Sequence, residues 1–257
     1  MTYQFIDVVC TNDVMEVSIQ RPEVLNALNI QAHAELADAF DKFSNDSALN
    51  IAVIRGSGER AFCVGSDLKE RAEVGSEMMP ASGFAGLTER FDLDKPVIAL
   101  VNGDAIGGGL EIILACDLAI AVNTARLGLP EPKVGLAASG GLHRLARQLP
   151  LKWAMEISLL GKLFDAATAS DIGLINEVVP RKSLEKTKER YLSGLRECST
   201  LSLRATKQMM LHGLAQGSLE NAFRANYPSF QRMLASEDAK EGVQAFAEKR
   251  KPVWKCR

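Results

Sequence analysis

The chain has 257 residues, of which 47% are apolar and 24% charged, a composition typical of a globular protein with a sizeable core. Its formal charge of −2 excludes the basic surface that would attract nucleic acid or an anionic membrane. No stretch reaches the roughly 18 uncharged apolar residues that a membrane-spanning helix needs, so we expect no membrane partner.

The five cysteines lie far apart in the sequence and form no C-x-x-C pair. This spacing argues against a zinc site or a disulfide framework and in favour of reduced thiols, so we expect no metal. Residues 1–7 lack the charge and apolar pattern of a secretory or transit signal. The sequence therefore predicts a soluble, cytoplasmic protein.

The first part of the chain alternates apolar runs of strand character with stretches of helical spacing. We expect strands at residues 6–10, 14–19 and 51–55, and a helix at residues 30–44. A loop at residues 61–67 should then enter a helix near Asp67, where an acidic residue suits the positive helix end.

The same order recurs further along the chain. We expect a strand at residues 97–101, a turn at 102–107, a helix at 108–115 and a strand at 118–122. Alternation of this kind predicts layered α/β architecture. After about Ser183 strand signals vanish, and the remaining apolar residues have helical spacing. An all-helical region of this size cannot bury its own apolar stripes, so it should pack on the body or on another subunit.

Three consecutive glycines, Gly107–Gly109, stand where a strand must enter a helix. Each costs a helix about 1 kcal/mol relative to alanine, but glycines let a ligand approach the main chain and the first helical N–H groups. Such groups stabilise an oxygen that becomes negative during a reaction. A tight packing turn without a ligand fits the glycines equally well. A phosphate loop does not, because the G-K-[ST] ending and the G-x-G-x-x-G spacing are both absent.

Glu111 lies in the same first helical turn as Gly108 and on the same side. Helical side chains lean toward the N-terminus, which brings this carboxylate close to whatever the Gly108 N–H binds. Alternatively, Glu111 only complements the positive helix end.

Six segments resemble, in the same order, the enoyl-CoA hydratase/isomerase (crotonase) family over nearly the whole chain. They are R-P-E-V-L-N-A-L-N at 21–29, A-F-C-V-G-S-D-L-K-E at 61–70, K-P-V-I-A-L-V-N-G at 95–103, C-D-L-A at 116–119, L-P-E at 129–131 and A-F-A-E-K-R at 245–250. The resemblance implies a spiral of ββα units in residues 1–195 that carries the acyl-CoA site. It also implies C-terminal helices in residues 196–257 for oligomer contacts, in a homotrimer or a hexamer made of two trimers.

Carried over residue by residue, the resemblance implies that the backbone N–H groups of Ser66 and Gly108 form an oxyanion hole for the thioester oxygen. Glu111 then acts as the base that orients a water, and protonated Glu131 delivers hydrogen to the α-carbon. One water adds reversibly and syn to a 2-enoyl-CoA. Two close carboxylates do not both ionise readily, which leaves one protonated near neutral pH. The CoA is part of the substrate, and no cofactor is implied.

The resemblance also implies contacts with the coenzyme A segment of the substrate. The residues that match these positions are Val24, Leu25, Val64, Asp67 and Leu68, joined by Phe246 and Lys249, which would reach the nucleotide of a neighbouring subunit. Lys249 also fits a solvated charge run at 248–251.

Two departures from the family pattern are visible. Residues 135–141, where a backbone group helps hold the water, are one residue shorter than usual, and Glu23 stands where relatives often have a basic residue. Residues 83–89, 93–96 and 249–255 resemble the carnitine-pathway branch, which hydrates crotonobetainyl-CoA. Its trimethylammonium group would need an aromatic or acidic cage, and the loop at 75–90 decides which side chains line the acyl pocket.

Other activities are compatible with the same fold, namely double-bond isomerisation, dehalogenation and thioester hydrolysis. Two glutamates favour hydration, because isomerases can work with one carboxylate, and Ser66 lacks the G-x-S-x-G pattern of a serine hydrolase. An RNA-binding second function would want a lysine-rich early helix, whereas the helix at 30–44 is acidic. The scattered histidines, His33, His143 and His212, receive no role, although His143 follows a glycine turn that could border the site.

Overall fold

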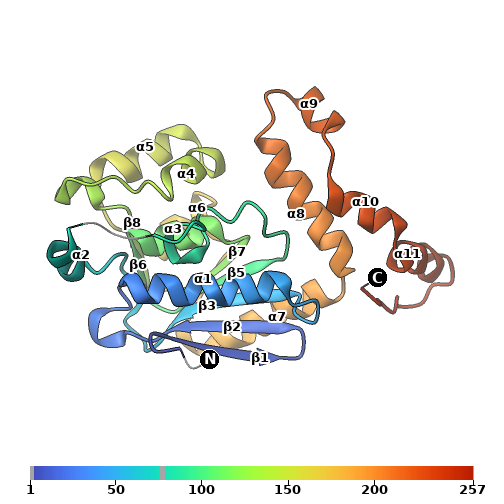
Figure 1. Ribbon diagram of the computed structural model, residues 1–257, viewed down its shortest axis with the longest axis horizontal. Helices are drawn as coiled ribbons and strands as arrows, with labels where there is room; N and C mark the ends of the chain where they lie inside the picture. The colour runs from blue at the N-terminus through green and yellow to red at the C-terminus, as the bar shows by residue number, and fades with distance from the viewer. Residues whose placement is uncertain (1–2, 76–78, 257) are drawn as a thin grey trace. The chain divides into compact units, whose positions relative to one another are not determined.

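Two β-sheets organise the computed structural model, which describes residues 3–75 and 79–256 (Figure 1). The larger sheet has the strand order β1-β2-β3-β5-β7-β10 and is parallel apart from the β1–β2 hairpin. Its strands are β1 (Ile6–Thr11), β2 (Val14–Ile19), β3 (Ile51–Gly56), β5 (Val97–Val101), β7 (Leu118–Val122) and β10 (Glu177–Val179). The central strands β3 and β5 are apolar and almost wholly buried, as expected for parallel strands covered on both faces.

A smaller sheet has the order β4-β6-β8-β9, with only the last pair antiparallel. Its strands are β4 (Ala61–Cys63), β6 (Asp104–Ile106), β8 (Arg126–Gly128) and β9 (Phe164–Asp165). Each of β4, β6 and β8 directly follows a strand of the larger sheet and leads into a helix. The chain thus winds through successive ββα units, and the fold class expected from the sequence is confirmed.

The loop predicted at residues 61–67 and the turn predicted at 102–107 are wrong in part, because they contain β4 and β6. These strands have three residues each, too few for an alternating pattern to show. They exist because they pair with each other, Ala61 opposite Asp104, across a wide sequence separation. By contrast, the strands at 97–101 and 118–122 and the helix at 108–115 are confirmed at both ends.

The long helix α1 (Ile30–Asn45) packs on β1 and β2. Asn29 caps it by accepting the Ala32 N–H at 2.9 Å, and it buries Leu36 and Phe40 completely. The other helices up to residue 196 are α2 (Leu68–Val74), α3 (Gly108–Ala115), α4 (Leu142–Gln148), α5 (Leu151–Leu160), α6 (Ala166–Asp171) and α7 (Leu184–Arg196). Short 3₁₀ helices lie at η1 (Pro22–Val24), η2 (Phe84–Gly86), η3 (Glu131–Val134) and η4 (Arg181–Ser183).

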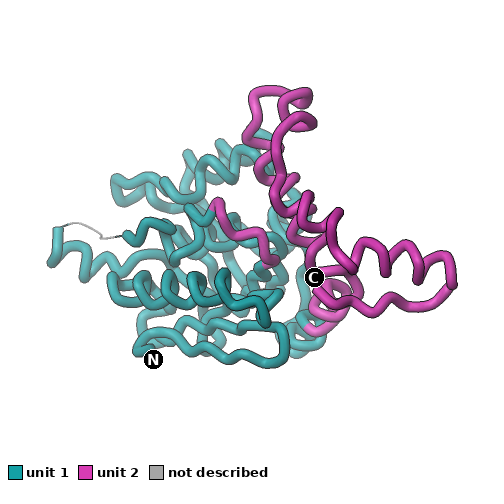
Figure 2. The backbone as a smooth tube through the Cα atoms, turned by 45° about the vertical axis from the view of Figure 1, so that its right-hand side comes forward, with its two compact units in different colours: residues 1–90, 97–188 teal, residues 91–96, 189–257 magenta. Residues whose placement is uncertain are grey.

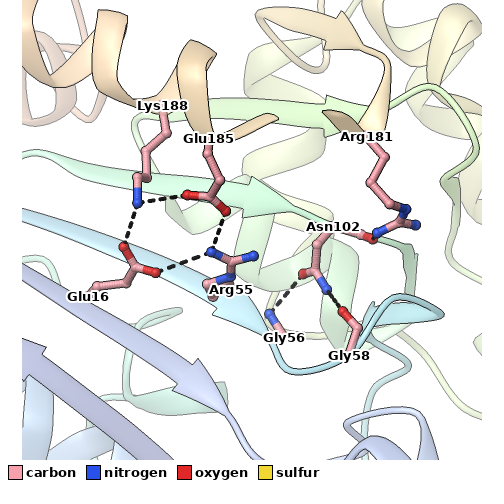
Figure 3. A network of polar contacts seen from close by, with 8 residues as sticks. All are labelled: Glu16, Arg55, Gly56, Gly58, Asn102, Arg181, Glu185 and Lys188. Carbon is pink, nitrogen blue, oxygen red and sulfur yellow. Dashed lines mark hydrogen bonds and ion pairs between the residues drawn. The ribbon is translucent and has the colours of Figure 1, made fainter. Parts of the chain in front are cut away.

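Asn102, at the end of β5, fastens the loops that lead into the smaller sheet (Figure 3). Its side chain accepts the Gly56 N–H at 3.0 Å and donates to the Gly58 carbonyl at 2.8 Å. The Arg181 guanidinium donates to the Asn102 carbonyl at 2.8 Å. Asn102 is 1% exposed, and its bond from the buried Gly56 N–H forms where water does not compete with it.

A charged network lies beside these loops (Figure 3). Arg55 of β3 pairs with Glu16 of β2 at 3.3 Å and with Glu185 of α7 at 2.6 Å, and Lys188 pairs with both glutamates at 2.9 Å. These pairs fix the start of α7 against the larger sheet.

The chain divides into two units, residues 1–90 with 97–188 and residues 91–96 with 189–257, with the boundary inside α7 (Figure 2). The second unit is helical, as predicted, with α8 (Thr200–Leu214), α9 (Leu219–Arg224), α10 (Pro228–Ala235) and α11 (Glu237–Ala247). Within it, Asp94 accepts hydrogen bonds from Arg204 at 2.8 Å and Ser229 at 2.7 Å. In the part of the chain that the structure describes, every helix is too short or too polar to cross a bilayer.

Candidate active site

A cavity of about 530 Å³ lies in the first unit, where β4, β6 and β8 each run on toward a helix. Its walls come from residues 64–66 and 68, from 106–108 and 111 at and after the end of β6, from 130–131 and 133–134, and from the segments 83–89 and 136–140. The volume is in the range of small-molecule sites. The smaller sheet therefore determines the position of this cavity.

Two backbone turns meet at one wall of the cavity. A Cβ atom on Gly65 would lie 3.1 Å from the Gly108 nitrogen, so the turn that carries Ser66 touches the start of α3. On that turn the Leu28 N–H donates to the Gly65 carbonyl and the Asp67 N–H donates to the Leu28 carbonyl, both at 2.8 Å. Within residues 3–75 and 79–256, neither the Ser66 N–H nor the Gly108 N–H donates a hydrogen bond, so both can serve a ligand.

The glycines of this turn are required by their surroundings. Gly107 has φ of +59°, and a Cβ on it would lie 2.8 Å from Glu131 Oε1. A Cβ on Gly109 would overlap the Cys63 carbonyl oxygen. These contacts support the packing-turn explanation of the glycines, and the approach of a ligand to this turn stays a prediction.

Glu111 lines the cavity from the first turn of α3 and is 6% exposed. Its Oε2 atom would lie 3.2 Å from a Cβ on Gly140, so the shortened segment 135–141 passes directly beside this carboxylate. Beneath it, burial raises the pKa of the Cys63 thiol to about 12, and the negative charge of Glu111 adds to the shift. Cys63 therefore stays protonated and is no nucleophile.

Glu131 begins η3 directly after Pro130 and also lines the cavity. Its Oε2 atom is buried and has no hydrogen-bond partner among the described residues. Burial disfavours the charged carboxylate and raises the pKa of Glu131. A carboxyl group of this kind keeps its proton to higher pH than an exposed glutamate, which suits a general acid.

The predicted site residues fall into three groups. Glu111, Glu131, Ser66, Gly108, Val64 and Leu68 line this one cavity. Val24, Leu25 and Asp67 belong to the same unit but are not among the residues that line it. Phe246 and Lys249 lie in the second unit, where both are exposed. The roles of all these residues in binding or catalysis remain predictions.

Asp67 stabilises the local fold through a helix cap and an ion pair. Its side chain caps α2 by accepting the Lys69 N–H and pairs with Arg21 at 2.9 Å. Partial burial opposes ionisation, but hydrogen bonds from Arg21 and the Glu70 N–H lower the pKa of Asp67. Its N–H donates to Leu28 and its carbonyl accepts from Arg71, so both main-chain groups already have partners.

Sequence reasoning did not assign several side chains that line the cavity, notably Phe84, Thr88 and Glu89. The only signal for them was the branch-like segment 83–89. His143 is exposed and is not among the lining residues, and His33 is buried, where its Nδ1 accepts the Ala85 N–H at 3.1 Å. The described residues contain no group of three His, Cys, Asp or Glu side chains arranged to hold a metal ion.

Comparison with known sequences gives one consistent family. The sequence model described as enoyl-CoA hydratase/isomerase matches residues 10–257. The chain is similar to carnitinyl-CoA dehydratase of Citrobacter koseri, with 40% identity over 255 residues and 95% of each chain covered. It is also similar to carnitinyl-CoA dehydratase of Proteus mirabilis, with 37% identity over 261 residues and 99% of each chain covered.

Solved structures agree. An enoyl-CoA hydratase from Mycobacterium tuberculosis H37Rv matches with a TM-score of 0.90 and 34% identity, covering 98% of this chain and 99% of that one. An enoyl-CoA hydratase from Bacillus anthracis matches with a TM-score of 0.88 and 30% identity, covering 99% and 100%.

Proposed function

Because the chain belongs to the enoyl-CoA hydratase/isomerase family, we propose that its cavity holds an acyl-CoA thioester between two amides and two glutamates. The enzyme is a hydro-lyase of the enoyl-CoA hydratase type, which adds water reversibly and syn to a 2-enoyl-CoA and gives a 3-hydroxyacyl-CoA. The observation that carries the site assignment is that Glu111, Glu131, Ser66 and Gly108 all line one cavity.

The amides of Ser66 and Gly108 bind the thioester oxygen. As water adds at the β-carbon, negative charge moves from the alkene onto this oxygen, and two preorganised N–H donors stabilise it without moving. The Gly108 N–H stands at the start of α3, where the helix dipole adds partial positive charge. Both donors are main-chain groups, so the Ser66 hydroxyl takes no part.

The two glutamates handle the water and its protons. Glu111 accepts a hydrogen bond from the water and takes its proton as the oxygen attacks the β-carbon. Glu131, whose pKa is raised by burial, gives its proton to the α-carbon, and dehydration runs the same steps in reverse. After hydration Glu111 holds the proton taken from water and Glu131 has lost its own, so a proton passes from Glu111 back to Glu131, directly or through solvent, before the next turnover. No metal or cofactor enters.

Glutamine in place of either glutamate tests this assignment. Loss of enoyl-thioester absorbance should be followed for the parent, Glu111→Gln, Glu131→Gln and the control Glu156→Gln, an exposed glutamate of α5. We expect each active-site variant to lower kcat by at least about 10²-fold, because general acid–base catalysis contributes 10²–10⁴. Calorimetry with butyryl-CoA, a saturated analogue, should give a Kd close to the parent value. Parent-like turnover by either variant contradicts the role of that carboxylate.

The names of the relatives support a proposal for the substrate class. The curated relatives reported above are named carnitinyl-CoA dehydratases. We propose that this enzyme likewise interconverts crotonobetainyl-CoA and its hydrated, trimethylammonium-bearing product. Comparable kcat/KM values for crotonobetainyl-CoA and crotonyl-CoA would remove this part of the proposal.

Double-bond isomerisation is the second candidate activity, since the family description includes it. It needs one carboxylate to move a proton between two carbons, whereas this cavity contains both Glu111 and Glu131. We therefore place hydration first. Incubation of a 3-enoyl-CoA in D₂O distinguishes the two, because an isomerase produces the 2-enoyl isomer without net uptake of water.

The assembly proposed is a homotrimer or a dimer of trimers, and the second unit supports it. Large apolar side chains of this unit are solvent-exposed in the single chain, for example Leu219 at 76% and Phe223 at 83%. Apolar surface of this kind marks a protein contact. Sedimentation equilibrium should give three or six times the monomer mass of 27.9 kDa, and a monomer contradicts the proposal.

A cytoplasmic location is proposed because the five cysteines form no disulfide within the described residues. Cell fractionation tests it, and recovery in an oxidising compartment contradicts it. Independence from a metal cofactor is tested by dialysis against EDTA, which should leave kcat unchanged.

A further inference from the structure

We infer that the Glu89 carboxylate determines selectivity for an acyl group that carries a quaternary ammonium. The inference rests on the proposed function of the cavity and assigns a residue to its substrate preference. It concerns the segment 83–89, to which the proposed hydration mechanism assigns no role.

Among the residues that the structure describes, three carboxylates line the cavity, those of Glu89, Glu111 and Glu131. The last two have roles in moving the water and its protons. The Glu89 side chain forms no ion pair or hydrogen bond with any residue in the described part of the chain. A carboxylate that lines a ligand cavity without a cation of its own is available to a cationic ligand.

Glu89 lies on the wall that also borders Glu111. A Cβ atom on Gly83 would lie 2.8 Å from Glu89 Cγ and would overlap Thr88 Oγ1, so these three residues are packed together. Thr88 Oγ1 and Glu111 Oε2 would each lie 3.2 Å from a Cβ on Gly140. The wall therefore leads from the catalytic base through Thr88 to Glu89, and an acyl substituent that extends past the alkene meets this carboxylate.

Local hydrogen bonds hold this wall in one conformation. The Glu89 N–H donates to the Ser82 carbonyl at 3.0 Å, and the Phe84 N–H donates to Thr88 Oγ1 at 2.8 Å. The wall is also fastened to α1, because the Ala85 N–H donates to His33 Nδ1 at 3.1 Å. The backbone of Glu89 is thus held in place before the substrate arrives, which reduces the entropy lost on binding.

The alternative recogniser of a quaternary ammonium is an aromatic cage. Among the described residues, Phe84 is the one aromatic side chain that lines the cavity. Its ring packs over Gly108 and stands edge-on to His33 with centroids 4.5 Å apart. One ring does not make a cage, so a carboxylate is the group that binds the positively charged ammonium of the substrate. The basic side chains that line the cavity, Arg71 and Lys133, come from α2 and η3 and not from this wall.

The test separates charge from shape. It compares kcat/KM for crotonobetainyl-CoA with that for the neutral isostere in which a tert-butyl group replaces the trimethylammonium group. The parent should prefer the charged thioester. Glu89→Gln should lower the ratio of the two kcat/KM values about tenfold, equivalent to ~1.4 kcal/mol, with most of the change in KM. A modest factor is expected because the Glu89 side chain is exposed and its charge is screened.

Two further variants complete the experiment. Glu89→Asp keeps the negative charge and should retain most of the parent ratio, and Glu156→Gln on α5 should leave the ratio unchanged. Should Glu89→Gln not fold, as judged by circular dichroism, Glu89→Lys takes its place, with a larger loss of the ratio expected.

The inference is overturned by an unchanged ratio in the folded Glu89→Gln or Glu89→Lys variant. It is also overturned if the parent shows no preference for the charged thioester while hydrating both. In either case the proposed hydration stands. Only a parent enzyme that hydrates neither thioester, nor crotonyl-CoA, contradicts the proposed function itself.

Discussion

Alanine at Gly108 perturbs the oxyanion hole by one methyl group. The added Cβ would lie 2.5 Å from Phe84 Cε1 and 2.7 Å from Cε2, closer than side-chain carbons approach. The Phe84 ring is 6% exposed, stands edge-on to His33 and borders the cavity, so a turn of the ring would carry it into the space proposed for the substrate. Either the ring or the first turn of α3 must shift, and that turn carries the Gly108 N–H.

The magnitude has two parts. Overpacking a tight interior typically destabilises by about 1–3 kcal/mol. Displacement of one oxyanion donor lowers kcat about 10²–10³-fold, or roughly 2.7–4 kcal/mol of transition-state stabilisation. Because the donor acts mainly in the transition state, we expect kcat to fall much more than KM rises.

The assay is hydration of crotonyl-CoA, with urea unfolding measured in parallel. The double variant Gly108→Ala/Phe84→Leu should recover much of the lost kcat when compared with Phe84→Leu alone, because the smaller side chain leaves room for the methyl group. Parent-like kcat and stability in Gly108→Ala would refute the reasoning. Equal loss in the single and double variants would show that the ring is not what displaces the amide.

Three further predictions concern protonation and stability. Burial raises the pKa of Glu131 above its ordinary 4.5, so the kcat of hydration should fall as pH rises through that raised value. Between the ordinary and the raised pKa the native state binds one more proton than the unfolded state, so the free energy of unfolding should also decline as pH rises. Glu131→Gln should remove this decline in stability. Asn102→Ala should lower the free energy of unfolding by about 1–3 kcal/mol in urea titrations, because the buried Gly56 N–H loses its partner and the Gly58 carbonyl loses a donor. A change under about 0.5 kcal/mol contradicts this role. Asp67→Ala should lower the free energy of unfolding by about 1–2 kcal/mol at neutral pH, because the α2 cap and the Arg21 pair are lost. The difference in stability between parent and variant should vanish as pH falls through the lowered pKa of Asp67. A constant difference in stability across that range contradicts this role of Asp67.

The sequence is most informative about elements that have strong local signals. The strand at 97–101 and the helix at 108–115 are predicted at both ends, because Asn102 and the triple glycine mark where the chain must change direction. The short strands β4 and β6, by contrast, are not predicted from the sequence. Their three residues carry no periodicity, and they form only when Ala61 meets Asp104 in the folded chain.

The site shows the same division. Spacing on one helix places Glu111 beside Gly108, and this depends only on local geometry. That Glu131 lies at the same cavity depends on the path of the chain through α3, β7 and β8, which no local rule predicts; only the family resemblance pointed to it. No sequence pattern marks Glu89, and its position at the cavity is known only from the folded structure, in which Gly83 and Thr88 pack against it.

The central claim is that two backbone amides and two glutamates converge on one thioester. A crystal structure with a bound 3-hydroxyacyl-CoA tests it most directly. We expect the thioester oxygen about 2.7–3.1 Å from both the Ser66 and Gly108 nitrogens. The 3-hydroxyl group should lie within hydrogen-bond reach of the Glu111 and Glu131 carboxyl groups. A thioester bound away from these amides, or a hydroxyl that only one glutamate can reach, would contradict the account.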